Sequence, residues 1–249
     1  MTETLQNRVA VITGATSGIG EATARRFAAE GAAVALLGRR QDRLQTLADD
    51  IAGPALPVAV DVGDPDALRR AADRIHREFG PVDLVVASAG VMLGAPFESA
   101  DPAEWQEMIG TNLTGLIHTG RAFVADLLAA AAAGRPADLV HVGSVGGHQV
   151  FPNYAVYDAT KAAVAHLTRN LRAELGPRGV RVKNIEPGVV STELGAGMRD
   201  TGQKEWLAGW RQSIETLRGA DIAEAVTWAV AAPARMNVAE LIVVPTPQG

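Results

Sequence analysis

The sequence RVAVITGATSGIG, Arg8–Gly20, joins a short apolar run to a glycine-rich turn and the start of a helical pattern. Gly14, Gly18 and Gly20 stand where a strand would pass into a helix. Without Cβ atoms there, the backbone can approach a pyrophosphate at the positive N-terminal end of that helix. The spacing differs from the common G-x-G-x-x-G fingerprint. The stretch predicts a phosphate cradle after the first strand of an α/β fold; the alternative is a turn that serves only helix–strand packing.

Six further apolar runs follow, and helix-length segments separate all seven. The runs are apolar on both faces, which is typical of parallel strands, because these need crossover connections that cover the sheet. We predict a Rossmann-type, doubly wound α/β fold with a seven-stranded parallel sheet and helices on both faces. The predicted strands are Arg8–Thr13, Ala33–Gly38, Leu56–Asp61, Asp83–Ser88, Ala137–Ser144, Val180–Gly188 and Glu240–Pro245.

No internal repeat, low-complexity linker or break in composition marks a domain boundary. We therefore predict one dinucleotide-binding domain over residues 1–249. One region, Ser191–Asp221, is too long for an ordinary turn between a strand and a helix. Long insertions at the carboxyl end of a strand are usually functional, and we predict a substrate lid at about residues 191–219, here called the lid segment.

Composition limits the possible partners. The chain has 249 residues, 47% of them hydrophobic and 20% charged, enough to bury the core of an α/β domain. A net charge of −5 provides no basic field for nucleic acid or an anionic membrane. The chain has no cysteine for a disulfide or a thiolate zinc site, and we expect no bound metal. It also lacks a signal-peptide pattern and an apolar run of roughly 18 residues, so we expect a cytoplasmic protein.

Two arginines follow the second predicted strand. Many nucleotide-binding sheets carry an acidic residue there for the ribose 2′-hydroxyl, whereas Arg39 and Arg40 suit a 2′-phosphate. The alternative is an ordinary solvated charge cluster at a helix start. Asp61 ends the third strand, where its carboxylate can accept from an adenine amino group or serve only as a turn residue or helix cap.

The motif YDATK places Tyr157 and Lys161 four residues apart, as neighbours on one face of a helix. A nearby ammonium favours the phenolate, so we expect the pKa of Tyr157 to fall from about 10 toward the working pH. Ser144 ends the fifth strand, and Asn112 lies among apolar helical residues, where its amide needs a partner. Each residue alone also fits a plain structural role, but together the four predict a site for proton transfer.

These motifs, with the Asp61–Val62 pair, Ser88–Gly90 and Glu186–Gly188, resemble the short-chain dehydrogenase/reductase family over essentially the whole chain. The resemblance implies that Tyr157 is the general acid/base, that Lys161 lowers its pKa and holds the nicotinamide ribose, that Ser144 hydrogen-bonds the substrate oxygen, and that Asn112 anchors a water. It also implies cofactor contacts from Gly14, Thr16, Ser17, Gly18, Ile19, Gly20, Arg39, Arg40, Asp61, Val62, Ser88, Ala89, Gly90, Pro187, Gly188, Val190 and Thr192.

Two departures from the family pattern stand out. Ser88 replaces the usual asparagine after strand four, which removes one supporting contact but no catalytic role. The C-terminal VPTPQ is similar to the branch that holds clavulanate dehydrogenase and the NADP-dependent 3-hydroxy acid dehydrogenases. We expect the substrate to contact Ser144, Val145, Gly146, His148, Tyr154, Tyr157, Leu194, Met198 and Trp206, although Trp206 also fits the packing face of an amphipathic helix.

The features together predict an NADP(H)-dependent oxidoreductase for a small or medium polar ketone or secondary alcohol, such as a 3-hydroxy acid or a secondary-metabolite carbonyl. A non-catalytic NADP(H)-binding redox sensor is the alternative, but a sensor needs no proton relay. An epimerase or dehydratase usually carries a longer C-terminal substrate domain. Residues 101–133 and 157–175 are apolar over more of their circumference than one sheet face covers, which favours a homotetramer or at least a dimer.

Overall fold

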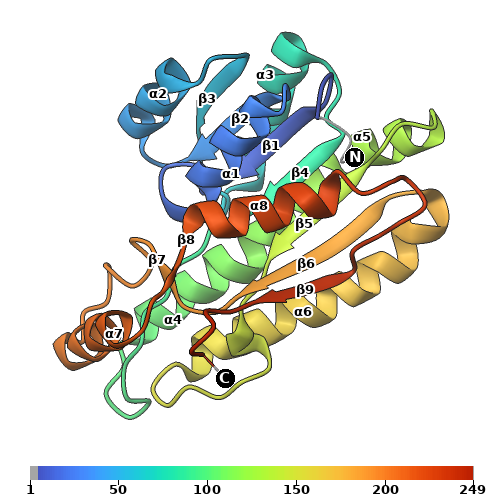
Figure 1. The fold of residues 1–249 in the computed structure, drawn as a ribbon. Coiled ribbons are helices and arrows are strands. Elements are labelled where there is room, and N and C mark those ends of the chain that lie inside the picture. Colours follow the sequence, from blue (N-terminus) through green and yellow to red (C-terminus); the bar gives the residue numbers. More distant parts are fainter. Residues whose placement is uncertain (1–4, 249) are drawn as a thin grey trace.

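A computed structural model describes residues 5–248. Seven strands form one sheet in the order β3-β2-β1-β4-β5-β6-β9, and every neighbouring pair is parallel (Figure 1). All seven predicted strands are present, with ends that differ by at most two residues. The strands are β1 Val9–Thr13, β2 Ala33–Gly38, β3 Ala55–Ala59, β4 Leu84–Ala87, β5 Asp138–Val142, β6 Arg181–Pro187 and β9 Glu240–Val243.

Helices cover both faces of this sheet (Figure 1). α1, α2 and α8 bury one apolar cluster that contains Phe27, and α3, α5 and α6 bury another on the opposite face that contains Phe123. The predicted doubly wound fold is therefore confirmed. The helices are α1 Gly18–Ala29, α2 Gln41–Asp50, α3 Pro65–Phe79, α4 Pro102–Met108, α5 Leu116–Ala132, α6 Ala155–Leu175, α7 Thr201–Ser213 and α8 Gly219–Val230.

Short polar signals set the ends of several helices. Asp64 accepts hydrogen bonds from two backbone N–H groups at the start of α3, and Pro65 fills the first helical position. Asp101 and Asp200 cap α4 and α7, each by accepting from one backbone N–H group. Gly80 follows α3 at φ +82°, a conformation that favours glycine. The local sequence thus explains where these elements begin and end.

A π-helical turn, Ile109–Gly115, joins α4 to α5, and the sequence pattern did not predict it. Asn112 lies in this turn and is 1% exposed. Its Oδ1 accepts from the N–H of Val91 at 2.8 Å, and its Nδ2 donates to the Val91 carbonyl at 2.9 Å. A buried amide is stable only when it is paired, so the loop after β4 supplies the partner that the helix cannot.

The lid segment leaves the sheet at the carboxyl ends of its strands (Figure 1). Val190–Ser191, β7, pairs in parallel with Leu217–Arg218, β8, and α7 lies between these two-residue strands in the chain. Such short strands give no recognisable sequence pattern. The ladder ties the two ends of the lid segment together. That this segment moves as a lid stays a prediction.

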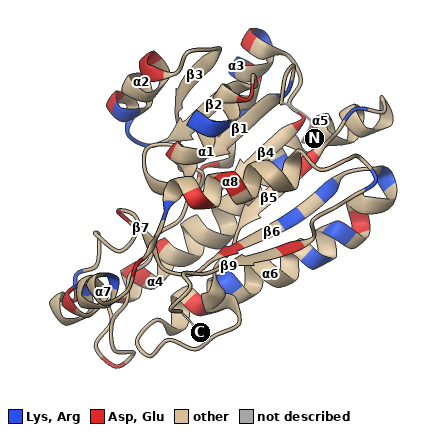
Figure 2. Ribbon diagram, in the orientation of Figure 1, with Lys and Arg blue, Asp and Glu red and all other residues tan. Residues whose placement is uncertain are grey.

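Acidic and basic positions are interspersed over the molecule in the view of Figure 2. One charged cluster is buried at the amino ends of the central strands, the edge opposite to the glycine-rich turn. There Asp138 contacts Arg8 at 3.0 Å, Arg181 at 2.8 Å and Lys183 at 3.0 Å. Across residues 5–248, no helix is both long and apolar enough to cross a membrane.

Candidate active site

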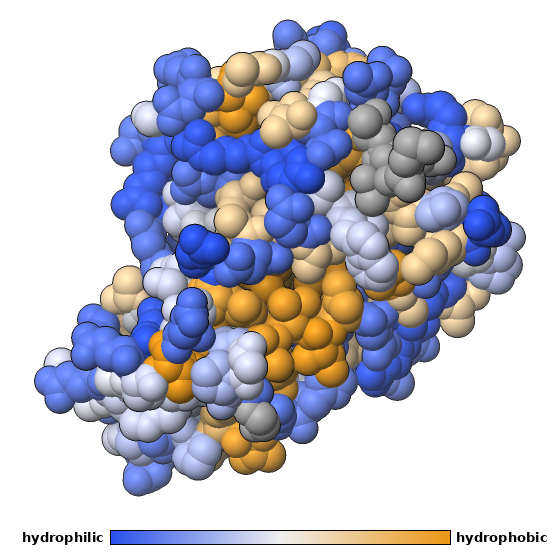
Figure 3. Space-filling model, viewed as in Figure 1, coloured by the Kyte–Doolittle hydropathy of each residue, from blue (hydrophilic) through white to orange (hydrophobic). Residues whose placement is uncertain are grey.

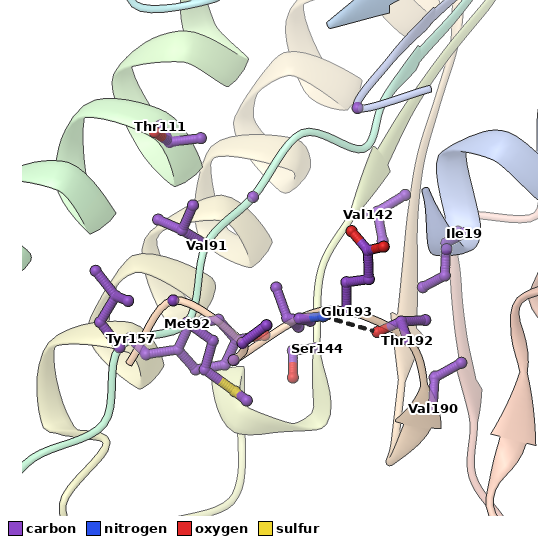
Figure 4. A pocket seen from close by; sticks show the side chains of 18 of the residues that line it. Ile19, Val91, Met92, Thr111, Val142, Ser144, Tyr157, Val190, Thr192 and Glu193 are labelled. Atoms are coloured by element: carbon purple, nitrogen blue, oxygen red, sulfur yellow. Dashed lines mark hydrogen bonds between the residues drawn. The ribbon is translucent and has the colours of Figure 1, made fainter. Parts of the chain in front are cut away.

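A cavity of about 580 Å³ opens at the carboxyl ends of the parallel strands. Segments from along the whole chain line it: the glycine-rich turn, the loops after β2, β4 and β5, the start of α6, and the lid segment. Figure 4 shows Ser144, Thr192 and Glu193 from two of these segments beside the same space. Ligands of open α/β sheets bind at this edge, so its position agrees with the fold.

The glycine-rich turn forms a cradle that larger residues would fill. Gly14 and Gly18 both have left-handed backbone, with φ of +69° and +59°. A Cβ on Gly14 would stand 2.9 Å from the Ala89 backbone, and one on Gly20 would stand 2.4 Å from the Gly14 carbonyl oxygen. Gly14 and Gly18 line the cavity, whereas Gly20 permits close packing of α1 beneath it. The cradle fits the approach of a diphosphate to backbone N–H groups.

The two arginines after β2 behave differently. Arg40 folds back onto the cradle: its guanidinium donates to the Thr16 hydroxyl at 2.7 Å and to the Ser17 hydroxyl at 3.1 Å. Arg39 is exposed and forms no side-chain hydrogen bond with any residue in the described range 5–248. Of the two predicted arginines, Arg40 therefore has the fixed position on the cradle.

The remaining cofactor candidates lie along the same wall. Asp61 lines the cavity while its Oδ1 accepts from the Gly63 N–H at 2.8 Å, so it is also a turn residue. Thr13 does not line the cavity and was not predicted, but it supports the wall: it is 1% exposed, and its Oγ1 accepts from the N–H groups of Ser88 and Ala89, both at 3.1 Å. The other expected residues on the wall are Thr16, Ser17, Ile19, Val62, Ser88, Ala89, Gly90, Pro187, Gly188, Val190 and Thr192.

Ser144, Tyr157 and Lys161 meet on one side of the cavity. The Ser144 Oγ accepts from the Gly146 N–H at 3.1 Å at the end of β5. Lys161, one helical turn after Tyr157 in α6, donates through Nζ to the Val142 carbonyl at 2.9 Å, and Nζ lies 5.7 Å from the centre of the Tyr157 ring. The predicted convergence of these three side chains is present in the fold.

The expected lowering of the Tyr157 pKa is wrong for this structure. Burial raises the pKa of Tyr157 to about 12, the Ser144 hydroxyl opposes that rise, and the Asp158 charge adds to it. Burial also lowers the pKa of Lys161 to about 8. Lys161 is not among the groups that shift the Tyr157 pKa, and its Nζ donates to the Val142 carbonyl instead. Tyr157 is therefore a protonated phenol at neutral pH.

Asn112 does not reach the cavity wall. Its side chain is occupied by Val91 and by Thr160, whose Oγ1 accepts from Nδ2 at 3.2 Å. The Asn112 Oδ1 and the Lys161 Nζ both lie beside Gly90, at 3.3 Å and 4.0 Å from the place of a Cβ on that residue. Asn112 thus fixes the loop that faces Lys161.

The expected substrate contacts divide into two groups. Val145, Tyr154, Leu194 and Trp206 line the cavity. Met198 is 1% exposed and lies behind the wall, 4.0 Å from the Tyr154 hydroxyl.

His148 and Gly146 lie away from the cavity, so the expectation that they contact the substrate is not supported. The ring of His148 lies 2.7 Å from Glu186, a carboxylate that is nearly inaccessible and needs a polar partner. A Cβ on Gly146 would meet Asp158 rather than open space. Two charged residues that the sequence analysis did not select, Glu193 and Arg211, lie on the cavity wall. Nothing in their local sequence distinguishes them from surface charges.

Comparison with known proteins agrees with this geometry. The chain is 36% identical over 243 residues to sulfoacetaldehyde reductase 2 of Chromohalobacter salexigens. The aligned region covers 96% of this chain and 95% of that protein. The closed form of a serine dehydrogenase complexed with NADP+ superposes with a TM-score of 0.89, at 33% identity over 97% of this chain and 96% of the other. The 3-ketoacyl-(acyl-carrier-protein) reductase of Brucella melitensis, complexed with NADH, superposes with a TM-score of 0.87. Its sequence identity is 31%, over 96% of this chain and 97% of the other.

Residues 8–203 match the family model described as short chain dehydrogenase. The match runs from the first strand through the cradle and Ser144 to the catalytic candidates in α6 and the start of α7. These relatives are named as reductases and a dehydrogenase, and the fold of the chain agrees with that of the solved structures. The chain therefore belongs to the short-chain dehydrogenase family and is an oxidoreductase that acts on CH–OH or C=O groups.

Proposed function

We infer that the chain transfers a hydride between NADP(H) and a ketone or secondary alcohol of small or medium size. The observation that carries this proposal is the meeting of a backbone cradle with Ser144, Tyr157 and Lys161 in one cavity. The cradle suits a diphosphate, and the three side chains suit proton exchange at an oxygen atom. A redox sensor would need the cradle alone.

Several residues are suited to hold the cofactor, which supplies the hydride when bound. The Gly14 and Gly18 backbone faces the diphosphate position, and Arg40 stands beside the cradle where a ribose 2′-phosphate would gain charge-assisted hydrogen bonds. Preference for NADP(H) over NAD(H) rests on Arg40 and on neighbours such as the serine dehydrogenase complexed with NADP+. The Brucella reductase is complexed with NADH, so measured kcat/KM values for both cofactors are needed to test the preference.

Tyr157 acts as the general acid in the direction of ketone reduction. Because its pKa is about 12, the phenol is protonated and has a proton to give as negative charge develops on the substrate oxygen. Ser144 lines the cavity beside it and donates a second hydrogen bond to the same oxygen. Lys161 holds the nicotinamide ribose, and Asn112 fixes the loop opposite to it through Val91. The role of Asn112 in anchoring a water stays a prediction.

A substrate panel tests this proposal. Ketones, secondary alcohols and 3-hydroxy acids are assayed with NADPH, NADP+, NADH and NAD+ by the absorbance of the reduced nicotinamide. We expect turnover of at least one carbonyl compound and a higher kcat/KM with NADPH. Tight cofactor binding without turnover of any compound would favour the redox sensor instead.

We also propose that the chain assembles as a homotetramer, or at least as a dimer. Figure 3 shows apolar side chains gathered on the face crossed by α8 and β9. Trp228 of α8 and Ile242 of β9 are 48% and 56% exposed, Met236 and Val244, on either side of β9 in the chain, are 42% and 36% exposed, and β9 is an edge strand. Exposed apolar patches on an edge favour association with a second copy. Light scattering at micromolar concentration tests this assembly, and a monomer would contradict it. The cytoplasmic location of the protein also stays a prediction.

A further inference from the structure

Within the described part of the chain, Arg211 stands on the cavity wall without an acidic partner. It lies near the end of α7, and its Nη2 donates to the Leu194 carbonyl oxygen 2.9 Å away. Its Nε is buried and has no hydrogen-bond partner. Over residues 5–248, Tyr154 is the one titratable group that raises the pKa of Arg211, and it does so only as the phenolate. The guanidinium therefore has donor capacity that the protein does not use.

Two other arginines of the cavity have acidic partners, whereas Arg39 is exposed to solvent. Arg40 pairs with Glu193 at 2.9 Å, and Arg199 forms an ion pair with Asp101. Burial instead lowers the pKa of Arg211, because no neighbouring carboxylate compensates for its lost hydration. A half-buried cation without a counter-ion costs free energy, and an anionic ligand at this place would recover it.

The surroundings of Arg211 on the cavity wall are aromatic. The rings of Tyr154 and Trp206 lie 5.9 Å apart, those of Trp206 and Trp210 lie 5.4 Å apart, and all three residues line the cavity. Burial raises the pKa of Tyr154 to about 12, so its phenol stays uncharged and does not act as the missing counter-ion. An apolar wall strengthens the attraction between a guanidinium and an anion.

The acidic residues nearest to Tyr154 are already engaged. Asp200 accepts from the Gln203 N–H at 2.8 Å and caps α7. Asp158 accepts from the Phe151 N–H at 3.2 Å, and its other oxygen lies beside Gly146. Both carboxylates thus accept from the backbone, and neither is among the groups that shift the pKa of Arg211.

We propose that Arg211 binds an anionic group of the substrate, a carboxylate or a sulfonate, while Ser144 and Tyr157 receive the carbonyl oxygen of the same molecule. This inference rests on the proposed hydride transfer and adds the substrate class to it: an oxo acid or hydroxy acid rather than a neutral ketone. Arg211 lies on α7, so the anion also joins the lid segment to the reaction site. The guanidinium is thereby a specificity-determining residue.

The test compares pairs of substrates that differ only in charge. Wild-type protein, Arg211→Gln and Arg211→Lys are assayed with a 3-oxo acid, its methyl ester and a 2-oxoalkanesulfonate. Charge-assisted hydrogen bonds correspond to roughly ten- to a hundredfold in binding. We expect the wild type to prefer the anions by that factor, mainly through KM. Arg211→Gln should lose the preference and Arg211→Lys should restore part of it; the better anion identifies carboxylate or sulfonate as the natural group.

Lys204→Gln is the matched control, because it removes one positive charge from an exposed position on the same helix. It should leave the preference for the acid over the ester unchanged. Equal use of acid and ester by the wild type, or equal loss for both in Arg211→Gln, would overturn the inference. If no compound is turned over, quenching of Trp206 and Trp210 fluorescence by the oxo acid decides anion binding separately from hydride transfer. In that case the absence of quenching would overturn it.

Discussion

Glu193 and Arg40 form an ion pair, with Glu193 Oε2 2.9 Å from Arg40 Nη1, and this pair joins the lid segment to the loop after β2. The same carboxylate lies 2.7 Å from Arg43 Nη1. Hydrogen bonds from both arginines lower the pKa of Glu193. Arg40 also holds the cradle through Thr16. Glu193 thus occupies the positive site that the proposed function assigns to a 2′-phosphate.

Removal of the carboxylate should strengthen the binding of NADPH. In Glu193→Gln, Arg40 and Arg43 no longer have an acidic partner for the 2′-phosphate to displace. Exposed ion pairs contribute about 0.2–1 kcal/mol, so we expect less than a tenfold gain in affinity. Calorimetric titration with 2′,5′-ADP measures the effect without turnover. Weaker binding in Glu193→Gln would show that the carboxylate supports the site rather than competes for it.

Loss of Arg40 should reduce the preference for NADPH. Arg40→Ala removes charge-assisted bonds to the 2′-phosphate, and we expect roughly a ten- to hundredfold drop in kcat/KM for NADPH with little change for NADH. Arg39→Asp should shift preference in the same direction, and by less than a change at Arg40, because Arg39 is exposed. Equal or better use of NADH by the unmodified protein would remove the basis for the cofactor assignment.

Tyr157→Phe should abolish most turnover while it preserves packing. Phenylalanine fills the same buried space but carries no proton, so we expect kcat to fall by at least roughly 10²–10⁴-fold. Cofactor affinity, measured by fluorescence titration, should stay close to that of the wild type. Activity retained in this variant would refute the role of Tyr157. Lys161→Ala should weaken both cofactor binding and rate.

Asp158→Asn should move the pH profile of alcohol oxidation. Oxidation needs the phenolate of Tyr157. Burial is the larger cause of the raised Tyr157 pKa, and the Asp158 charge raises that pKa as well. We expect the alkaline rise of kcat/KM to begin at lower pH, by less than about one pH unit. Asp66→Asn, an exposed acid on α3 paired with Arg69, is the control and should leave the profile unchanged. A pH profile that does not move would show that Asp158 has no effect on the titration of Tyr157.

The same variant has a consequence for stability. Burial raises the pKa of Asp158 to about 6, so between about pH 4 and pH 6 the folded protein binds this proton more tightly than the unfolded chain does. The contribution of Asp158 to the free energy of unfolding therefore falls as pH rises through that range. We measure the free energy of unfolding by urea at several pH values. Its slope against pH should be less negative in Asp158→Asn than in the wild type.

Asp138→Asn should destabilise the fold strongly. Asp138 is fully buried and contacts three cations, Arg8, Arg181 and Lys183, which outweigh burial and lower the pKa of the Asp138 carboxyl. Removal of one partner from a buried ion cluster costs about 3–5 kcal/mol of stability. Urea unfolding measures the loss in this variant. Asp66→Asn should cost less than about 1 kcal/mol. A small loss in Asp138→Asn would mean that the cluster relaxes or takes up water.

The sequence by itself determined the seven strands, their helical crossovers and the edge of the sheet that carries the site. Apolar runs and glycines report local backbone needs, and the parallel crossover rule leaves few topologies. Tyr157 and Lys161 were also predictable as neighbours, because four residues on a helix fix their relation. The choice of Ser144 followed from its place at the end of β5.

Tertiary structure alone decided which charges act at the site. Arg40 rather than Arg39 lies on the cradle, His148 turns to Glu186, and Arg211 keeps a buried Nε without a partner. The pKa of Tyr157 rises because desolvation depends on every segment packed around the ring, including segments far away in the chain. Side-chain direction and burial are long-range properties, so no local pattern in the sequence encodes them.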